Sequence, residues 1–218
     1  MAIRDNISKL KSLVPPEVKL VAVSKFHPVE RLMEAYDAGQ RLFGENRPQE
    51  FAAKVPLMPA DVRWHFIGHL QTNKLKLVLP YVSLLESVDS MHLLEAVDAW
   101  GKANGKVVPV LLELHLGAEE SKHGFSPEEI LSIIEGNRQN IKICGLMGMA
   151  TNTDDADVVE NDFSRIHELF LRIRSEHPAL SDTFTELSIG MSGDWPLAVK
   201  HGATIIRIGT DIFGPREY

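Results

Sequence analysis

LVAVSK, residues 20–25, is an apolar, partly β-branched run that ends abruptly in one lysine, Lys25. A buried strand of a parallel sheet reads as a near-continuous hydrophobic run, and the residues at 26–28, including Pro28, end it. Lys25 is therefore expected at the rim of a hydrophobic core. Desolvation there lowers the pKa of an amine, and the neutral amine is the form that condenses with an aldehyde. The alternative is that Lys25 simply extends from the strand end into solvent.

Outward from this stretch, apolar runs alternate with helical patterns along the chain. Strands are expected at 20–24, 42–44, 64–67, 82–85, 107–114, 141–146, 185–189 and 204–208. Helices are expected at 2–13, 29–38, 48–55, 72–78, 91–103, 127–135, 156–176 and 195–200. Eight β/α units favour an α/β fold, a single closed (β/α)8 TIM-type barrel over residues 1–218 with an extra N-terminal helix. A doubly wound open sheet is the structural alternative.

Composition and charge narrow the possible partners. The formal net charge is −7, which argues against nucleic acid and against an anionic membrane surface as partners. No apolar run approaches the length of a membrane span, and the N-terminus turns polar at once, without a signal-peptide pattern. Cys144 is the only cysteine and is expected to be a small core residue. We expect a cytoplasmic protein.

The loops after the last two expected strands carry the clearest sign of a ligand. Residues 190–194 and 209–214 both combine glycines with a hydroxyl residue. Glycine lets backbone N–H groups approach an anion, and barrels often hold phosphate at this position. Arg207 lies inside the last apolar strand, where it needs either a buried carboxylate or a ligand as partner. A lysine with a phosphate site predicts an aldehyde that carries phosphate, such as pyridoxal 5′-phosphate (PLP) or a sugar phosphate.

Other polar residues at the strand ends keep two interpretations each. His65 can contact a cofactor or satisfy a backbone group, and Glu45 can support Asn46 or face solvent. We expect His123 to be a solvated loop residue rather than a general base. The nine histidines lack a metal-ligand spacing such as H-E-x-x-H, so no metal site is expected.

The sequence resembles the pyridoxal 5′-phosphate homeostasis proteins. The matching segments span nearly the whole chain in the same order: VAVSK (21–25), FGEN (43–46), HFIG (65–68) with LQ (70–71) and NK (73–74), SK (121–122) with GF (124–125), GLM (145–147), LS (187–188) with GMS (190–192), and IRIGT (206–210) with IFG (212–214). The resemblance implies a barrel like the alanine racemase N-terminal domain, with PLP held as an internal aldimine. Lys25 is the implied Schiff-base lysine, and Ser192, Gly209 and Thr210 are the implied phosphate-binding residues.

The resemblance implies roles for two further residues, and one segment differs from the family's usual sequence. It implies that Asn46 lies near the cofactor ring and Arg207 near the pyridine nitrogen. An arginine there disfavours a protonated ring nitrogen and weakens the ring as an electron sink. Residues 115–118, HLGA, depart from the family's usual pattern, so the contacts of the fifth loop do not carry over.

The resemblance implies a protein that carries or buffers PLP, with effects on vitamin B6 and amino-acid balance, without robust catalytic turnover. PLP-dependent apoenzymes are the expected recipients, and a monomer is expected. The alternative is a PLP-dependent amino-acid racemase. Such racemases add a C-terminal β domain with a catalytic tyrosine, whereas the tyrosines here are Tyr36, Tyr81 and Tyr218, none on a strand-end loop facing Lys25. A third reading is a PLP-independent aldolase.

Overall fold

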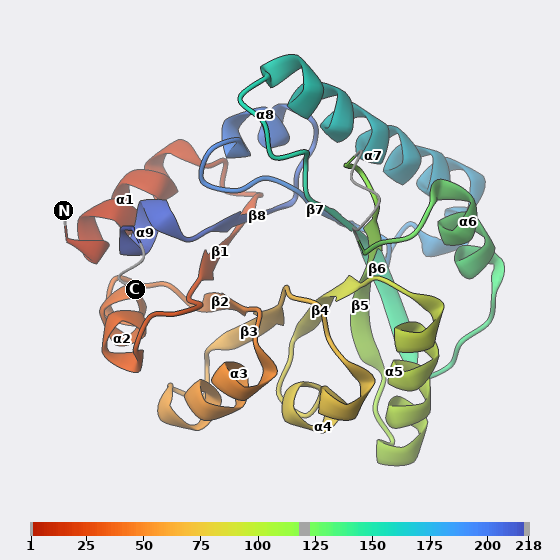
Figure 1. Ribbon diagram of the computed structural model, residues 1–218, viewed down its shortest axis with the longest axis horizontal. Helices are drawn as coiled ribbons and strands as arrows, with labels where there is room; N and C mark the ends of the chain where they lie inside the picture. The colour runs from red at the N-terminus through yellow and green to blue at the C-terminus, as the bar shows by residue number, and fades with distance from the viewer. Residues whose placement is uncertain (1, 118–122, 216–218) are drawn as a thin grey trace.

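Eight parallel strands form a closed barrel in the computed structural model, which describes residues 2–117 and 123–215 (Figure 1). The strands pair in chain order, and β8 closes the barrel against β1. They are β1 (Lys19–Val23), β2 (Leu42–Glu45), β3 (Arg63–Phe66), β4 (Leu84–Val88), β5 (Val108–Leu114), β6 (Ile141–Gly148), β7 (Glu186–Ser188) and β8 (Ile205–Ile208). The predicted closed barrel is confirmed, and the open sheet is excluded because no strand of the barrel remains an edge.

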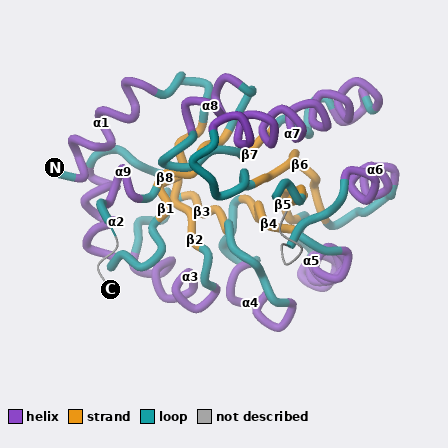
Figure 2. The backbone as a smooth tube through the Cα atoms, turned by 45° about the horizontal axis from the view of Figure 1, so that its top comes forward, coloured by secondary structure: helices purple, strands orange, loops and turns teal. Residues whose placement is uncertain are grey.

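Helices surround the strands as an outer layer (Figure 2). They are α1 (Ile3–Leu13), α2 (Val29–Asp37), α3 (Pro48–Lys54), α4 (Leu75–Val78), α5 (Met91–Asn104), α6 (Pro127–Glu135), α7 (Ala156–Glu176), α8 (Trp195–Lys200) and α9 (Thr210–Phe213). Short 3₁₀ turns occur at Val55–Leu57, Thr72–Lys74 and Pro178–Leu180. Within the described residues, none of the helices combines the length and apolarity that crossing a membrane requires.

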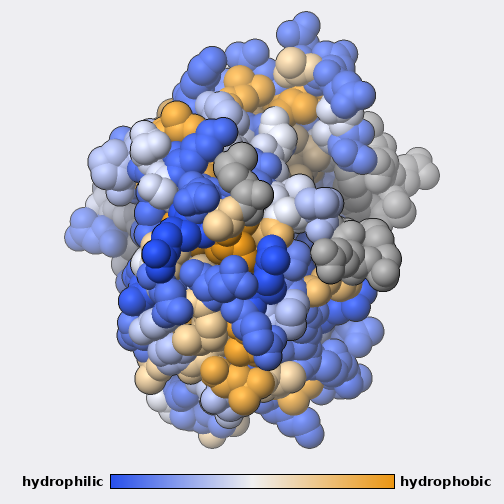
Figure 3. All heavy atoms as spheres, turned by 90° about the vertical axis from the view of Figure 1, so that its left-hand side faces the viewer, coloured by the Kyte–Doolittle hydropathy of each residue, from blue (hydrophilic) through white to orange (hydrophobic). Residues whose placement is uncertain are grey.

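The extra N-terminal helix packs on the outside of the barrel. α1 contacts α2 and α9, and the Asn6 side-chain amide donates a 2.9 Å hydrogen bond to the carbonyl of Ile212. Its apolar positions Ile3, Ile7 and Leu10 are buried, in agreement with their helical spacing. The outward face formed by α1, α2 and α9 is mostly hydrophilic, with small apolar patches (Figure 3). The outer layer therefore turns its apolar stripe toward the barrel.

The barrel interior is built in two layers of different chemistry. An apolar layer consists of the buried side chains Val21, Leu42, Leu84, Leu111, Met147 and Ile205. Because side chains alternate along a strand, residues two positions further on point into the same interior. On β3, β4, β5, β7 and β8, the buried polar residues at these inward-facing positions are His65, Glu86, Glu113, Ser188 and Arg207. The polar layer thus lies between the apolar layer and the carboxyl ends of the strands.

Three local expectations were wrong. The fourth strand is β4 (Leu84–Val88) rather than 82–85, because Glu86 continues the strand and finds polar partners inside the barrel. The loop expected after the eighth strand instead begins with a turn of helix, α9. Cys144 is only partly buried, beside the inner apolar layer rather than fully within a core.

Candidate functional site

The end of β1 holds Lys25 in a tight turn at the mouth of the barrel. The strand stops at Val23, Ser24 is fully buried, and Lys25 is partly buried. Phe26 follows with φ +68°, a left-handed conformation that is uncommon for a bulky residue and marks local strain. The Phe26 N–H donates a 2.7 Å hydrogen bond to the carboxylate of Glu50, which helps to hold this turn. The backbone direction after Lys25 is therefore fixed by the turn.

A buried ion pair supports the turn from below. Lys54, from α3, donates to the Glu45 carboxylate at 2.7 Å and to the Ser24 carbonyl at 2.8 Å. The Ser24 hydroxyl donates to the same Glu45 oxygen at 2.6 Å. Burial raises the pKa of Glu45, and the charge of Lys54 opposes this rise. Glu45 is fully buried, so the solvent-facing interpretation is wrong. Its printed hydrogen bonds connect β2 with α3 and with Ser24, the residue before Lys25, rather than with Asn46.

Asn46 follows β2 and offers an unsatisfied acceptor at the mouth. Its side-chain oxygen Oδ1 is buried and has no hydrogen-bond partner in the described part of the chain. Gly68, after β3, packs directly on Asn46: a Cβ at Gly68 would lie 2.4 Å from the Asn46 carbonyl oxygen and 2.7 Å from its Cβ. A buried polar atom without a partner costs stability unless a ligand or water satisfies it. Asn46 thus fits a ligand with a hydrogen-bond donor.

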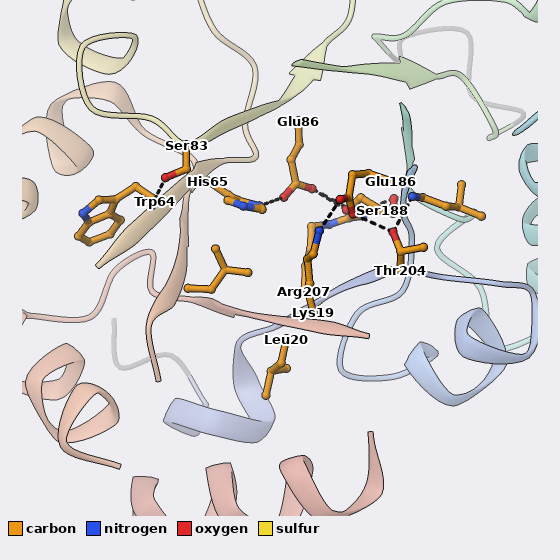
Figure 4. A network of polar contacts seen from close by, with 12 residues as sticks. Lys19, Leu20, Trp64, His65, Ser83, Glu86, Glu186, Ser188, Thr204 and Arg207 are labelled. Atoms are coloured by element: carbon orange, nitrogen blue, oxygen red, sulfur yellow. Dashed lines mark hydrogen bonds and ion pairs between the residues drawn. The ribbon is translucent and has the colours of Figure 1, made fainter. Parts of the chain in front are cut away.

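A chain of buried polar side chains crosses the barrel interior (Figure 4). Arg207 donates to the Ser188 hydroxyl at 2.6 Å and carbonyl at 2.8 Å, and its other nitrogen donates to the Gly148 carbonyl at 2.8 Å. The Ser188 hydroxyl donates to Glu86 at 2.5 Å, and His65 bonds to the other oxygen of Glu86. The network links β3, β4, β6, β7 and β8, so it fixes the direction of Arg207 at the centre of the barrel.

The ionisation of Glu86 is set by this network. Burial alone would raise the pKa of its carboxyl, but the hydrogen bond from His65 and the charges of His65 and Arg207 lower the pKa below its usual value. Arg207 lies 3.9 Å from the Glu86 carboxylate. The buried carboxylate that the sequence left open as a partner for Arg207 is therefore Glu86, and His65 contacts this carboxylate rather than a backbone group.

Glu113 is a second buried carboxyl in the polar layer. Burial, followed by the negative charge of Asp89, raises its pKa to about 7. Arg207 and His69 act in the opposite direction but do not offset these effects. Near neutral pH this position on β5 therefore holds a comparable mixture of the neutral and ionised forms.

The two glycine-hydroxyl loops meet at neighbouring strand ends. Ser192 lies in the turn between β7 and α8, while Gly209 and Thr210 follow β8. The Arg207 N–H donates a 2.9 Å hydrogen bond to the Gly190 carbonyl, which holds the two strand ends together. Hydroxyl and backbone N–H groups at this end of a barrel suit a phosphate group.

The sequence-predicted site residues are thus brought to one end of the molecule: Lys25, Asn46, Ser192, Arg207, Gly209 and Thr210 all lie in or directly after strands β1, β2, β7 and β8. The sequence patterns did not single out Glu86, Glu113 and Ser188 as site residues. Their signal is a polar residue at an inward-facing position of an apolar strand. Ser121 and Lys122, matched in the resemblance, lie outside the described residues.

Residues 1–217 match the family "Alanine racemase, N-terminal domain". The fold and the site therefore define the class of the alanine racemase N-terminal barrels. The chain is 37% identical to the pyridoxal phosphate homeostasis protein of Haemophilus influenzae, over 92% of this chain and 86% of that protein. It is 39% identical to the human protein of the same name, over 92% of this chain and 77% of that protein. The chain belongs to the pyridoxal phosphate homeostasis protein family.

Solved structures show the same likeness. PipY of Synechococcus elongatus PCC7942, solved without PLP, has a TM-score of 0.91 at 38% identity, covering 97% of this chain and 100% of that chain. The PLP-bound structure of PipY has a TM-score of 0.88 with the same identity and coverage. Alanine racemase of Clostridium difficile has a TM-score of 0.80 at 14% identity, covering all of this chain and 57% of the racemase, which shows the shared fold alone.

Proposed function

We propose that this chain binds PLP through a Schiff base on Lys25 and carries or buffers the cofactor, without robust catalytic turnover. The observation that carries the proposal is the meeting of Lys25, the unsatisfied Asn46 oxygen and buried Arg207 at one barrel mouth, in a chain 38% identical to a protein solved with PLP bound. The bond would form by condensation of the Lys25 amine with the PLP aldehyde, with loss of water.

The residues present fit the two ends of this cofactor. In the proposal, Ser192, Gly209 and Thr210 hold the phosphate with hydroxyl and backbone donors. Asn46 contacts the ring substituents through its orphaned oxygen, and Arg207 faces the pyridine nitrogen. The network of Ser188, Glu86 and His65 orients Arg207, which remains protonated at any physiological pH and cannot serve as an acceptor for a ring N–H.

The placement of the tyrosines supports the non-catalytic part of the proposal over a racemase. A two-base racemase needs a second base facing the lysine. Tyr36 lies on α2 and its hydroxyl donates to Asp61 at 2.8 Å, while Tyr81 is exposed just before β4. Both positions precede a strand and so lie toward the amino-terminal end of the barrel, away from Lys25. Tyr218 lies outside the described residues.

On the basis of the sequence, we also propose that residues 1–218 form a single domain and that the protein is a cytoplasmic monomer. We propose further that it transfers PLP to PLP-dependent apoenzymes. Transfer from a Schiff base requires only that an incoming amine displaces Lys25, which suits a carrier as well as an enzyme.

Titration of the PLP-free protein with PLP tests the proposal. We expect visible absorbance that saturates at one PLP per chain, is lost in Lys25→Ala, and is kept in the exposed-lysine control Lys102→Ala. Thr210→Val removes one hydrogen bond to a charged group, so it weakens PLP binding about tenfold or more but leaves binding of pyridoxal, which lacks the phosphate, unchanged. Equal PLP affinity in the wild type and Lys25→Ala would refute the proposal.

A further inference from the structure

A cluster of two histidines and an aspartate follows strands β3, β4 and β5, at the same end of the barrel as the proposed PLP residues. His69 belongs to the loop after β3, Asp89 follows β4 directly, and His123 lies between β5 and α6. Their ligand-type atoms all lie within 4.8 Å of one another. The sequence gives no sign of this site, because the three residues are far apart in the chain and come together only when β3, β4 and β5 pair.

The arrangement has the geometry of a partly formed coordination site. The Asp89 oxygen Oδ2 is 2.6 Å from His69 Nδ1 and 3.7 Å from His123 Nδ1. The two imidazole rings are stacked, with centroids 4.2 Å apart and planes 18° apart, so both present Nδ1 toward the same carboxylate. Three ligand atoms from three adjacent strand ends therefore converge on one point.

Asp89 supplies an independent sign of a missing partner. Its side chain is only 1% exposed, and its second oxygen, Oδ1, is buried without a hydrogen-bond partner among the described residues. A buried carboxylate oxygen in this condition is costly unless a cation or donor compensates it. A cation held by the carboxylate and both imidazoles would supply that compensation.

We propose that His69, Asp89 and His123 bind one divalent transition-metal ion of the zinc type, separately from PLP. Two imidazole nitrogens and a carboxylate suit Zn²⁺ or Co²⁺, whereas Mg²⁺ and Ca²⁺ prefer oxygen ligands alone. Three protein ligands leave the fourth tetrahedral position to water or to a small anion. His123 also lines a groove of about 990 Å³ beside β5 and β6, through which such a ligand can reach the ion.

The site can accommodate the ion with small side-chain movements. A tetrahedral ion with ligands at about 2.0–2.1 Å places neighbouring ligand atoms about 3.3 Å apart. The His69–Asp89 contact must therefore open slightly, and the His123 contact must shorten slightly. Both histidine side chains are free to adjust, with 47% and 62% of their surface exposed, while Asp89 stays fixed by burial.

Zinc binding to tag-free, chelator-treated full-length protein without PLP tests the proposal. We expect calorimetry to show one Zn²⁺ per chain, and Co²⁺ to produce the visible absorbance of a tetrahedral site. His123→Ala and His69→Ala each remove a ligand and should weaken zinc binding by at least about tenfold. Loss of a residue that only supports a metal ligand already weakens metal binding about tenfold or more. Because both side chains are substantially exposed, neither variant should change the far-UV circular dichroism.

His177→Ala is the matched control, since this histidine lies at the far end of α7 and outside the cluster. It should bind zinc as the wild type does. Absence of saturable zinc binding in the wild type overturns the proposal, and so does equal binding by the wild type and His123→Ala. Because PLP is absent throughout, these outcomes are independent of the Schiff-base proposal.

Discussion

Removal of the Lys54 amine tests whether the buried ion pair supports the end of β1. In Lys54→Met the side chain keeps its apolar length but loses the hydrogen bonds to the carboxylates of Glu45 and Glu50 and to the Ser24 carbonyl. The Lys54 and Glu45 side chains are 7% and 0% exposed, so water cannot replace the lost partner. The variant leaves a buried carboxylate whose remaining side-chain donor, among the residues that the structure describes, is the Ser24 hydroxyl.

Breaking one partner out of a buried ion pair costs about 3–5 kcal/mol. We expect the free energy of unfolding at neutral pH to fall by this amount in Lys54→Met. Because burial favours the neutral form of Glu45, part of the loss should be recovered in acid, where the carboxyl binds a proton. The double variant Glu45→Gln with Lys54→Met removes the charge as well and should recover much of the loss at neutral pH.

Urea denaturation followed by circular dichroism measures these differences, with an unchanged m-value as the check that the unfolding reaction is the same. Lys102→Met, on the exposed face of α5, is the matched control and should change stability by no more than about 0.5 kcal/mol. A loss below about 1 kcal/mol in Lys54→Met, or no recovery in the double variant, would show that the ion pair does not stabilise this part of the barrel.

Three further predictions concern the polar layer, the barrel backbone and turnover. Burial raises the pKa of Glu113 from 4.5 to about 7 in the folded protein, so between these pH values the folded protein binds a proton that the unfolded chain has lost. The free energy of unfolding should therefore fall as the pH rises from about 4.5 toward 7, by up to about 1.4 kcal/mol per pH unit. Glu113→Gln should flatten this slope in urea denaturation measured across the same pH range. Gly145→Ala places a Cβ 1.7 Å from the Glu186 carbonyl oxygen and should prevent stable folding. In the control Gly105→Ala the Cβ meets nothing within 4 Å, so the free energy of unfolding should fall by only about 1 kcal/mol. Similar thermal midpoints of the two variants would contradict the close packing of β6 on β7 at Gly145. Incubation with L-alanine should give no racemisation above a Lys25→Ala control, as followed by chiral chromatography, and clear turnover would overturn the non-catalytic proposal.

The barrel could be predicted from the sequence because its strands are short apolar runs and its helices have regular apolar spacing. The end of β4 could not, since a charged residue such as Glu86 ends an apolar run in the sequence but continues the strand in the fold. What makes that possible is the hydrogen bond from Ser188 and the contact with His65, both from strands distant in the chain. Long-range partners of this kind leave no local signal.

In the candidate site, too, some residues have a local sequence pattern and others come together only through packing. Lys25 and the two glycine-hydroxyl loops are visible in the sequence because each is a local pattern at a strand end. The support of the Lys25 turn by Glu45 and Lys54 is not visible, because it depends on how α3 packs beneath β1 and β2. The cluster of His69, Asp89 and His123 is likewise a product of strand pairing alone.

Borohydride reduction of the PLP-treated protein, followed by peptide mass spectrometry, tests the central claim most directly. Reduction turns a Schiff base into a stable secondary amine and so marks the lysine that held PLP. We expect one phosphopyridoxyl group per chain, attached to Lys25. A modification found only on another lysine, with Lys25 unmodified, would contradict it.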